Sequence, residues 1–127
     1  MKVVYLAHPV APPCACGAEC DEFAALGPVD CNCTRARRWL RWAIDAHADI
    51  AFCVPWLPYL DVLTDDGGPV RARGLRDDVA MALRCDEIWL VGGRVSRGMA
   101  QERDAMAAAG KTVVDLTDLG HEPPEAP

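Results

Sequence analysis

The sequence lacks any apolar run that approaches the roughly 20 residues needed to cross a bilayer, so it predicts no membrane-spanning segment. It also lacks a basic excess: 13 Lys and Arg stand against 19 Asp and Glu, and the net charge of −6 argues against a nucleic-acid polymer as partner. The N-terminal apolar run is followed at once by His8 and Pro9, which favours a buried strand over a signal peptide. We therefore expect a cytoplasmic protein with a small-molecule partner.

No internal repeat or second domain is visible in the 127 residues. A hydrophobic fraction of 51% and a charged fraction of 25% are typical of an ordinary globular protein with a core of its own. We expect residues 1–117 to form a single domain. The segment 118–127 is polar and rich in proline, and we expect it to be frayed.

Short apolar runs alternate with helical patterns along the chain. This alternation predicts a small open parallel sheet of the flavodoxin or Rossmann-like kind, with order about 2-1-3-4 and helices on both faces. Residues 55–68 carry two prolines and two glycines early and late in the segment, and we interpret them as a loop. The expected strands are residues 2–7, 50–54, 87–91 and 111–116, and the expected helices are residues 34–47, 69–84 and 98–109.

The segment 11–33 is the expected Cys-rich loop, and it holds five of the seven cysteines. Four thiolates around a structural Zn²⁺ would hold such a long connection together. Free thiols, or disulfides formed during purification, are the alternatives. Cys53 and Cys85 are expected to be small core residues. The expected zinc ligands are Cys14, Cys16, Cys31 and Cys33, with Cys20 as an alternative ligand.

Glu102 interrupts an otherwise apolar face of the last expected helix. Met99 and Met106 lie on that face, and a carboxylate between them is costly unless something uses or pairs it. Glu102 follows the carboxyl end of a strand, where ligands bind, and a helix N-terminus favours the ionised form of a carboxyl. Both features favour a carboxylate nucleophile. The alternatives are a dipole-stabilised acid or an ion pair with Arg73 or Arg76.

Four other side chains are candidates for the same sheet edge. Asp78 lies near the inner face of its helix and would handle a proton or hold a sugar hydroxyl, unless it is a solvated edge acid. Ser96 with Gly98 would form an anion site, or simply a helix cap followed by a turn. Tyr5 would reach the cleft, or pack in the core. His8 points toward the expected cleft, although a histidine at a strand end is more often structural.

Several stretches resemble the nucleoside 2-deoxyribosyltransferase-like superfamily over nearly the whole chain except residues 11–30 and the tail. The second half also resembles 2′-deoxynucleoside 5′-monophosphate N-hydrolases, in which S-x-G stands at the 5′ end of the sugar. The resemblance is closest to an uncharacterised branch with N…ARRW after the first loop and a central L-x-D-D. The matching stretches are VVYLAHP (3–9), ARRW (36–39), CDEIWLVGG (85–93), SRGMAQE (96–102) and AAAGKTVV (107–114).

The resemblance implies roles for individual residues. Glu102 matches the nucleophile that attacks the anomeric carbon, Asp78 the acid that assists the departing base, and Tyr5 a tyrosine that contacts the nucleophile or the sugar. Ser96 in place of an aspartate favours a nucleotide, because a hydroxyl can bond a phosphate. The candidate substrate-binding residues are His8, Gly92, Ser96, Gly98 and Met99.

The function implied is an N-glycosidase or glycosyltransferase that acts on a (deoxy)nucleotide or nucleoside, needs no cofactor and forms a homodimer or higher homo-oligomer. Two departures favour an alternative from another class. His8 stands where the family has a small residue, and the first loop carries cysteines in place of a Gly/Arg phosphate-binding sequence. The alternative is a non-catalytic nucleotide-binding or assembly protein whose cysteine loop is held by zinc.

Overall fold

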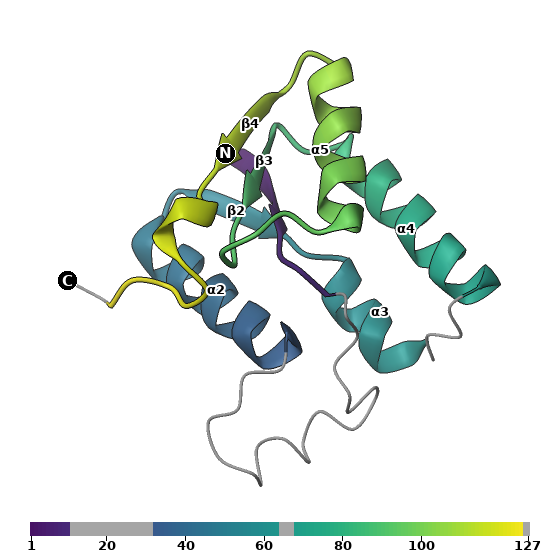
Figure 1. Ribbon diagram of the computed structural model, residues 1–127. Coiled ribbons are helices and arrows are strands. Elements are labelled where there is room, and N and C mark those ends of the chain that lie inside the picture. The colour runs from purple at the N-terminus through teal and green to yellow at the C-terminus, as the bar shows by residue number, and fades with distance from the viewer. Residues whose placement is uncertain (11–31, 64–67, 126–127) are drawn as a thin grey trace, which may run out of the picture.

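A computed structural model describes residues 1–10, 32–63 and 68–125 of the chain. Its centre is a four-stranded sheet in which every pairing is parallel and the order is β2-β1-β3-β4 (Figure 1). The expected fold class and strand order are confirmed. The strands are β1 (Lys2–Ala7), β2 (Ile50–Cys53), β3 (Glu87–Leu90) and β4 (Thr112–Asp115).

Strand β1 lies in the middle of the sheet, and its last four residues are buried. A continuous apolar run is what a parallel strand covered on both faces requires. In the register, Ala7 pairs with Leu90 of β3. The chain therefore leaves β1 and β3 at neighbouring points on one edge of the sheet, which is where open α/β sheets place their ligands.

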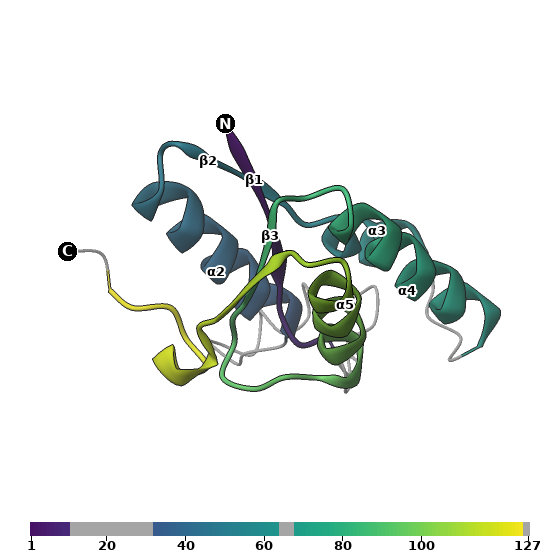
Figure 2. The same ribbon diagram turned by 90° about the horizontal axis from the view of Figure 1, so that it is seen from above.

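Helices cover both faces of the sheet, as Figure 2 shows from above. On one face lies α2 (Asn32–Ala46), whose Trp39 and Ala43 pack against Val4 and Leu6. On the other lie α3, α4 and α5, which bury the second core cluster around Tyr5 and Ala7. The bounds of these three helices are Trp56–Val62, Pro69–Ala82 and Arg97–Ala108.

The expected loop over residues 55–68 is wrong for Trp56–Val62, which form α3. Pro58 is tolerated there because it lies in the first helical turn, where backbone N–H groups have no partner within the helix. Tertiary contact fixes the segment: Trp56 is buried, and its Nε1 donates a hydrogen bond to the Leu6 carbonyl at 2.9 Å. The sequence pattern in this segment is short, and it does not reveal this contact with β1.

The segment expected to be frayed instead contacts α2. After a short 3-10 helix (Thr117–Leu119), the His121 carbonyl accepts a hydrogen bond from Trp39 Nε1 at 2.8 Å. Arg38 Nε donates to Glu122 Oε2 at 2.8 Å. One buried indole that needs an acceptor and two arginines, Arg38 and Arg35, hold a polar segment that buries little apolar surface. Within the described residues, no helix is long and apolar enough to cross a membrane.

Candidate functional site

A cavity of about 120 Å³ opens at the carboxyl edge of the sheet, between the end of β1 and helices α3, α4 and α5. Six of the residues expected at the site from the sequence line it, and they come from three separate parts of the chain. These six are His8, Asp78, Ser96, Gly98, Met99 and Glu102.

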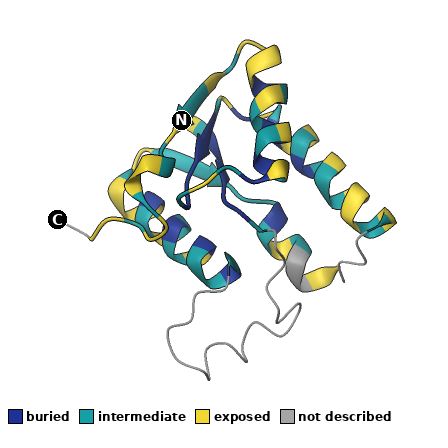
Figure 3. Ribbon diagram, in the orientation of Figure 1, coloured by how far each residue is buried: buried dark blue, intermediate teal, exposed yellow. Residues whose placement is uncertain are grey.

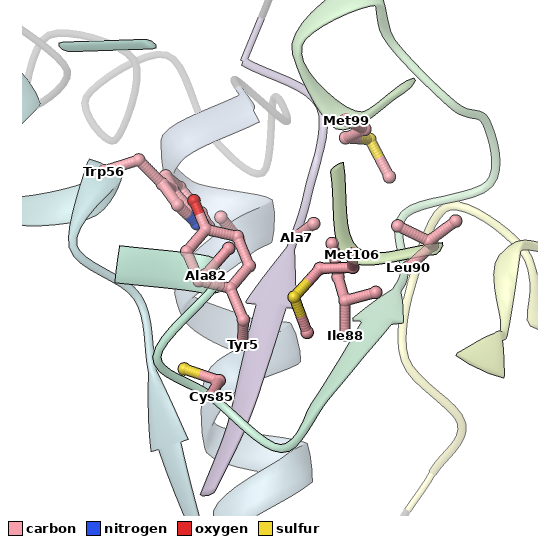
Figure 4. Close-up of a cluster of buried hydrophobic side chains, with 10 residues drawn as sticks. Tyr5, Ala7, Trp56, Ala82, Cys85, Ile88, Leu90, Met99 and Met106 are labelled. Atoms are coloured by element: carbon pink, nitrogen blue, oxygen red, sulfur yellow. The ribbon is translucent and has the colours of Figure 1, made fainter. Parts of the chain in front are cut away.

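Tyr5 and Gly92 lie beside this cavity without lining it. Tyr5 is fully buried in the apolar cluster shown in Figure 4, and its hydroxyl lies near the Glu102 carboxyl, where it acts to lower the pKa of that group, without a well-formed hydrogen bond among the described residues. Gly92 has φ +100° and lies against the His8 ring, where an added Cβ would come within 2.7 Å of His8 Nε2. A side chain at position 92 would therefore displace the histidine as well as strain the backbone.

Glu102 lies on the inner face of α5 between Met99 and Met106, and all three side chains are buried. Its Oε2 has no hydrogen-bond partner within the described part of the chain. The alternative of an ion pair with Arg73 or Arg76 is wrong, because both arginines bind Asp77. The carboxyl therefore keeps the burial cost that the sequence pattern indicates, without a counter-ion.

The environment raises the pKa of Glu102 to about 8, first through burial and then through the charge of Asp78; Tyr5 opposes this in part. The expected ionising effect of the helix N-terminus is outweighed. Helix α5 begins at Arg97, so Glu102 lies in the second turn, beyond the reach of the helix dipole. Desolvation therefore decides the protonation state.

Asp78 faces the same cavity from α4. It is buried, and its Oδ1 has no hydrogen-bond partner in residues 1–10, 32–63 and 68–125, so the alternative of a solvated edge acid is wrong. Burial, with a contribution from the charge of Asp77, raises the pKa of Asp78 to about 7. Two carboxyls from different helices thus share one water-poor cavity, and each resists ionisation near neutral pH.

His8 is a neutral acceptor at the end of β1. Its Nδ1 lies 2.7 Å from the Pro9 carbonyl, and a carbonyl only accepts, so Nδ1 carries the hydrogen. Burial lowers the pKa of His8 to about 4, so the ring is uncharged at neutral pH. The ring stacks on Trp56 with centroids 6.4 Å apart. Its Nε2 therefore offers a lone pair that no described residue uses.

Ser96 caps helix α5, as the simpler of its two readings expects. Its Oγ accepts a hydrogen bond from the Met99 backbone N–H at 3.2 Å, which satisfies one of the free donors at the helix start. Gly98 lies close to α4, since an added Cβ would come 3.3 Å from Leu75 Cδ2. The absence of a side chain at Gly98 therefore lets α4 and α5 approach closely at the cavity.

The wall of the cavity that α3 and the start of α4 supply was not predicted from the sequence. A signal existed in the spacing i, i+3 and i+7 of Trp56, Tyr59 and Leu63, which is one face of a helix. The prolines around these residues favoured a loop instead. The missed lining residues are Val10, Trp56, Tyr59, Leu63, Val70, Arg71, Gly74 and Leu75.

The expected zinc ligands are nearly all beyond the described residues. Cys14, Cys16, Cys20 and Cys31 lie outside them, and Cys33 is buried on the first turn of α2. Within residues 1–10, 32–63 and 68–125, no cluster of three or more His, Cys, Asp or Glu side chains is arranged to hold a metal ion.

Comparison with known proteins identifies one family and a distant fold relative. The family model described as Domain of unknown function (DUF7768) matches residues 2–116. A solved structure, described as 2-desoxiribosyltransferase from Leishmania mexicana, is similar to this chain with a TM-score of 0.51 and 18% sequence identity. The match covers 91% of this chain but only 63% of that one, so this chain spans less than two thirds of its length. No curated protein sequence matches. At this identity the likeness shows a shared fold.

Proposed function

We propose that this chain, which belongs to the DUF7768 family, cleaves the N-glycosidic bond of a (deoxy)nucleotide or nucleoside and passes the sugar to water or to another base. One observation carries the proposal: Glu102 and Asp78 meet, buried and with unpartnered oxygens, in a cavity at the carboxyl edge of the sheet. The fold shared with a structure described as a 2-desoxiribosyltransferase supports it. Two carboxyls beside the scissile bond, one of them an acid with a raised pKa, are typical of glycosyl transfer.

The reaction takes place in two displacements. An ionised Glu102 oxygen forms a bond to C1′ of the sugar while the C1′–N bond breaks, and the electron pair of that bond leaves with the base. Asp78 gives its proton to the departing nitrogen. Water or a second base then attacks C1′, returns a proton to Asp78 and releases Glu102. Each step uses protein carboxyls and substrate atoms alone, so the proposal needs no cofactor.

The protonation states set a narrow working range. The reaction needs Glu102 ionised and Asp78 protonated, and the pair titrates with apparent pKa values of about 7 and about 8. The higher pKa belongs to Glu102, so in the free protein the single proton lies mostly on that residue and must pass to Asp78 when substrate binds. Below this range both carboxyls hold protons, and above it neither does. We expect a bell-shaped dependence of kcat/KM on pH with its maximum between the two values.

The decisive experiment compares wild type with Glu102→Gln, which keeps the shape and the neutral state of the buried side chain. A panel of 2′-deoxynucleosides, ribonucleosides and their 5′-monophosphates is incubated with each protein, and released base is measured by chromatography. Glu102→Gln should lower turnover by at least about 10³-fold while nucleotide binding persists. Glu122→Gln, an exposed Glu on the opposite face, is the matched control. Unchanged turnover in Glu102→Gln would reject the mechanism.

A second candidate is a non-catalytic nucleotide-binding protein. It is favoured by the raised pKa of Glu102, because a protonated carboxyl at pH 7 donates a hydrogen bond to a ligand without attacking it. Binding without release of base from any member of the panel would select this candidate. Metal analysis with a thiol titration would test its zinc-held loop, and light scattering would test the expected homo-oligomer.

A further inference from the structure

Within the described part of the chain, a side-chain hydrogen bond connects helix α3 to helix α4 beside the cavity. Tyr59 Oη donates to Asp77 Oδ2 at 2.9 Å, and these two residues lie on different helices. Asp77 also accepts from Arg73 Nε at 2.9 Å and from Arg76 Nη2 at 3.2 Å. The Asp77 side chain is only 16% exposed, and its three donors lower its pKa, so it stays ionised and fixed in place.

Tyr59 lines the cavity, whereas Asp77 lies behind it. Helix α3 has only seven residues and no side-chain cap, so its own backbone bonds give it little stability. It is held by tertiary contacts at two points: the Trp56 indole at its start and the Tyr59 hydroxyl one turn later. Breaking the second contact releases the aromatic ring that faces the cavity.

Asp77 also acts on the acid in the cavity. It directly precedes Asp78, and its fixed charge contributes to the raised pKa of that carboxyl. The titratable groups whose charges interact with Asp78 are Asp77, Glu102, Tyr5 and Tyr59. One carboxylate outside the cavity therefore influences both its aromatic wall and its acid.

We propose that Asp77 is a positioning residue, and that it holds the Tyr59 ring against the planar base of the substrate. This inference rests on the proposed function, because it assumes that the leaving group is an aromatic heterocycle. Apart from Arg71, the wall next to Tyr59 is apolar, with Trp56, Leu63 and Leu75, and this apolar part suits the face of such a ring. The carboxyls of Asp78 and Glu102 line the same cavity, and in this arrangement they contact the sugar and the glycosidic bond.

The test uses Tyr59→Phe and Asp77→Asn, which weaken the same bond from opposite ends. Each should raise KM about tenfold and leave kcat within about twofold, because the wall binds base without touching C1′. The double variant should be no worse than either single variant, since only one bond exists to lose. Asp45→Asn is the matched control: Asp45 forms an i,i+4 pair with Arg41 on the opposite face of the sheet, as Asp77 does with Arg73.

The pH profile separates Asp77 from a merely structural residue. Asp77→Asn removes a negative charge beside Asp78, so the alkaline limb of kcat/KM, which reports loss of the Asp78 proton, should move to lower pH. Tyr59→Phe keeps that charge and should leave the limb in place. Wild-type KM in both variants, or an additive double variant, would overturn the proposal.

Hydrogen exchange over residues 56–62 distinguishes a failure of the positioning role of Asp77 from a failure of the proposed function. One outcome is faster exchange in both variants, while the intrinsic tryptophan fluorescence of the wild type responds to no 2′-deoxynucleoside or 5′-monophosphate. That outcome would overturn the role in base binding together with the proposed function. It would leave Asp77 as the residue that holds α3. Unchanged exchange in both variants would overturn the positioning role itself.

Discussion

The two faces of the sheet are built from the same four strands and are filled in opposite ways. Beneath α2, aromatic rings pack edge to face, with centroids 5.4 Å apart for Trp39 and Trp42 and 5.5 Å for Phe52 and Trp89. Two of the indole N–H groups have acceptors: that of Trp39 donates to the His121 carbonyl and that of Trp89 donates to Glu87. Figure 3 shows that the central strands β1 and β3 are mostly buried, whereas β2 and β4 are intermediate or exposed.

The face beneath α4 and α5 holds a cavity and two uncompensated acids instead. Tyr5 Oη, Asp78 Oδ1 and Glu102 Oε2 are buried there without hydrogen-bond partners among the described residues. Each such atom costs stability, whereas the aromatic face gains it. Packing on the α2 face therefore supplies stability that offsets the cost of the buried acids on the other face.

The largest expected effect lies on the filled face. Trp39→Ala should lower the free energy of unfolding by about 3 to 5 kcal/mol, because it leaves a large cavity and removes the donor that holds His121. Denaturant titration measures the loss. Trp42→Ala is a control on the same helix, where the ring is only partly buried. A loss below about 1 kcal/mol for Trp39→Ala would break the contrast between the two faces.

On the cavity face, Glu102→Gln should stabilise the protein. In the folded chain Glu102 keeps its proton up to a pKa of about 8, while the unfolded chain releases it near 4.5, so wild-type stability falls as pH rises through this window. Gln cannot ionise. The variant should therefore gain up to about 4 kcal/mol relative to wild type at pH 8 and almost nothing at pH 4. Thermal melts across this range measure the difference, and a pH-independent difference would refute the account.

Asp78→Asn tests the cavity face through turnover and its dependence on pH. The variant lacks the proton donor, so turnover should fall about 10²-fold. Loss of the Asp78 charge also lowers the pKa of Glu102, because that charge helps to raise it. The bell-shaped profile should become a single rise with a midpoint below about pH 8. A bell that keeps both limbs would show that Asp78 is not the titrating acid.

The smallest effect is expected at the rim of the filled face. Glu122→Gln breaks the pair with Arg38, whose partner Glu122 is about half exposed, so it should cost about 0 to 1 kcal/mol. Arg38 lowers the pKa of Glu122, so this stability is present above pH 4.5 and is lost as pH falls through the lower folded pKa. The change of this contribution to stability with pH is opposite in sign to the change expected for Glu102. Melts at pH 3 and pH 7 test it.

Some parts of the site follow from local pattern and others do not. The helical period alone predicts that Glu102 lies on an inward face, because Met99 and Met106 fix that face. The wall at Tyr59 does not follow from pattern, because its helix exists through contacts with Leu6 and Asp77, which are distant in sequence. The motif-based resemblance indicated the fold, Asp78 and a tyrosine near the nucleophile, but it carried no information about how deeply either carboxyl is buried.

The sequence by itself determined the order of strands and helices and the sheet they form, since hydrophobic periodicity and short connections leave few arrangements for such a pattern. It also determined that an acid would be buried in the last helix. Only the tertiary structure decided that a second acid lies in the same cavity, that burial outweighs the helix dipole in setting their pKa values, and that α3 forms at all. The physical reason is that desolvation and charge–charge interaction depend on distances through space, which neighbours along the chain do not fix.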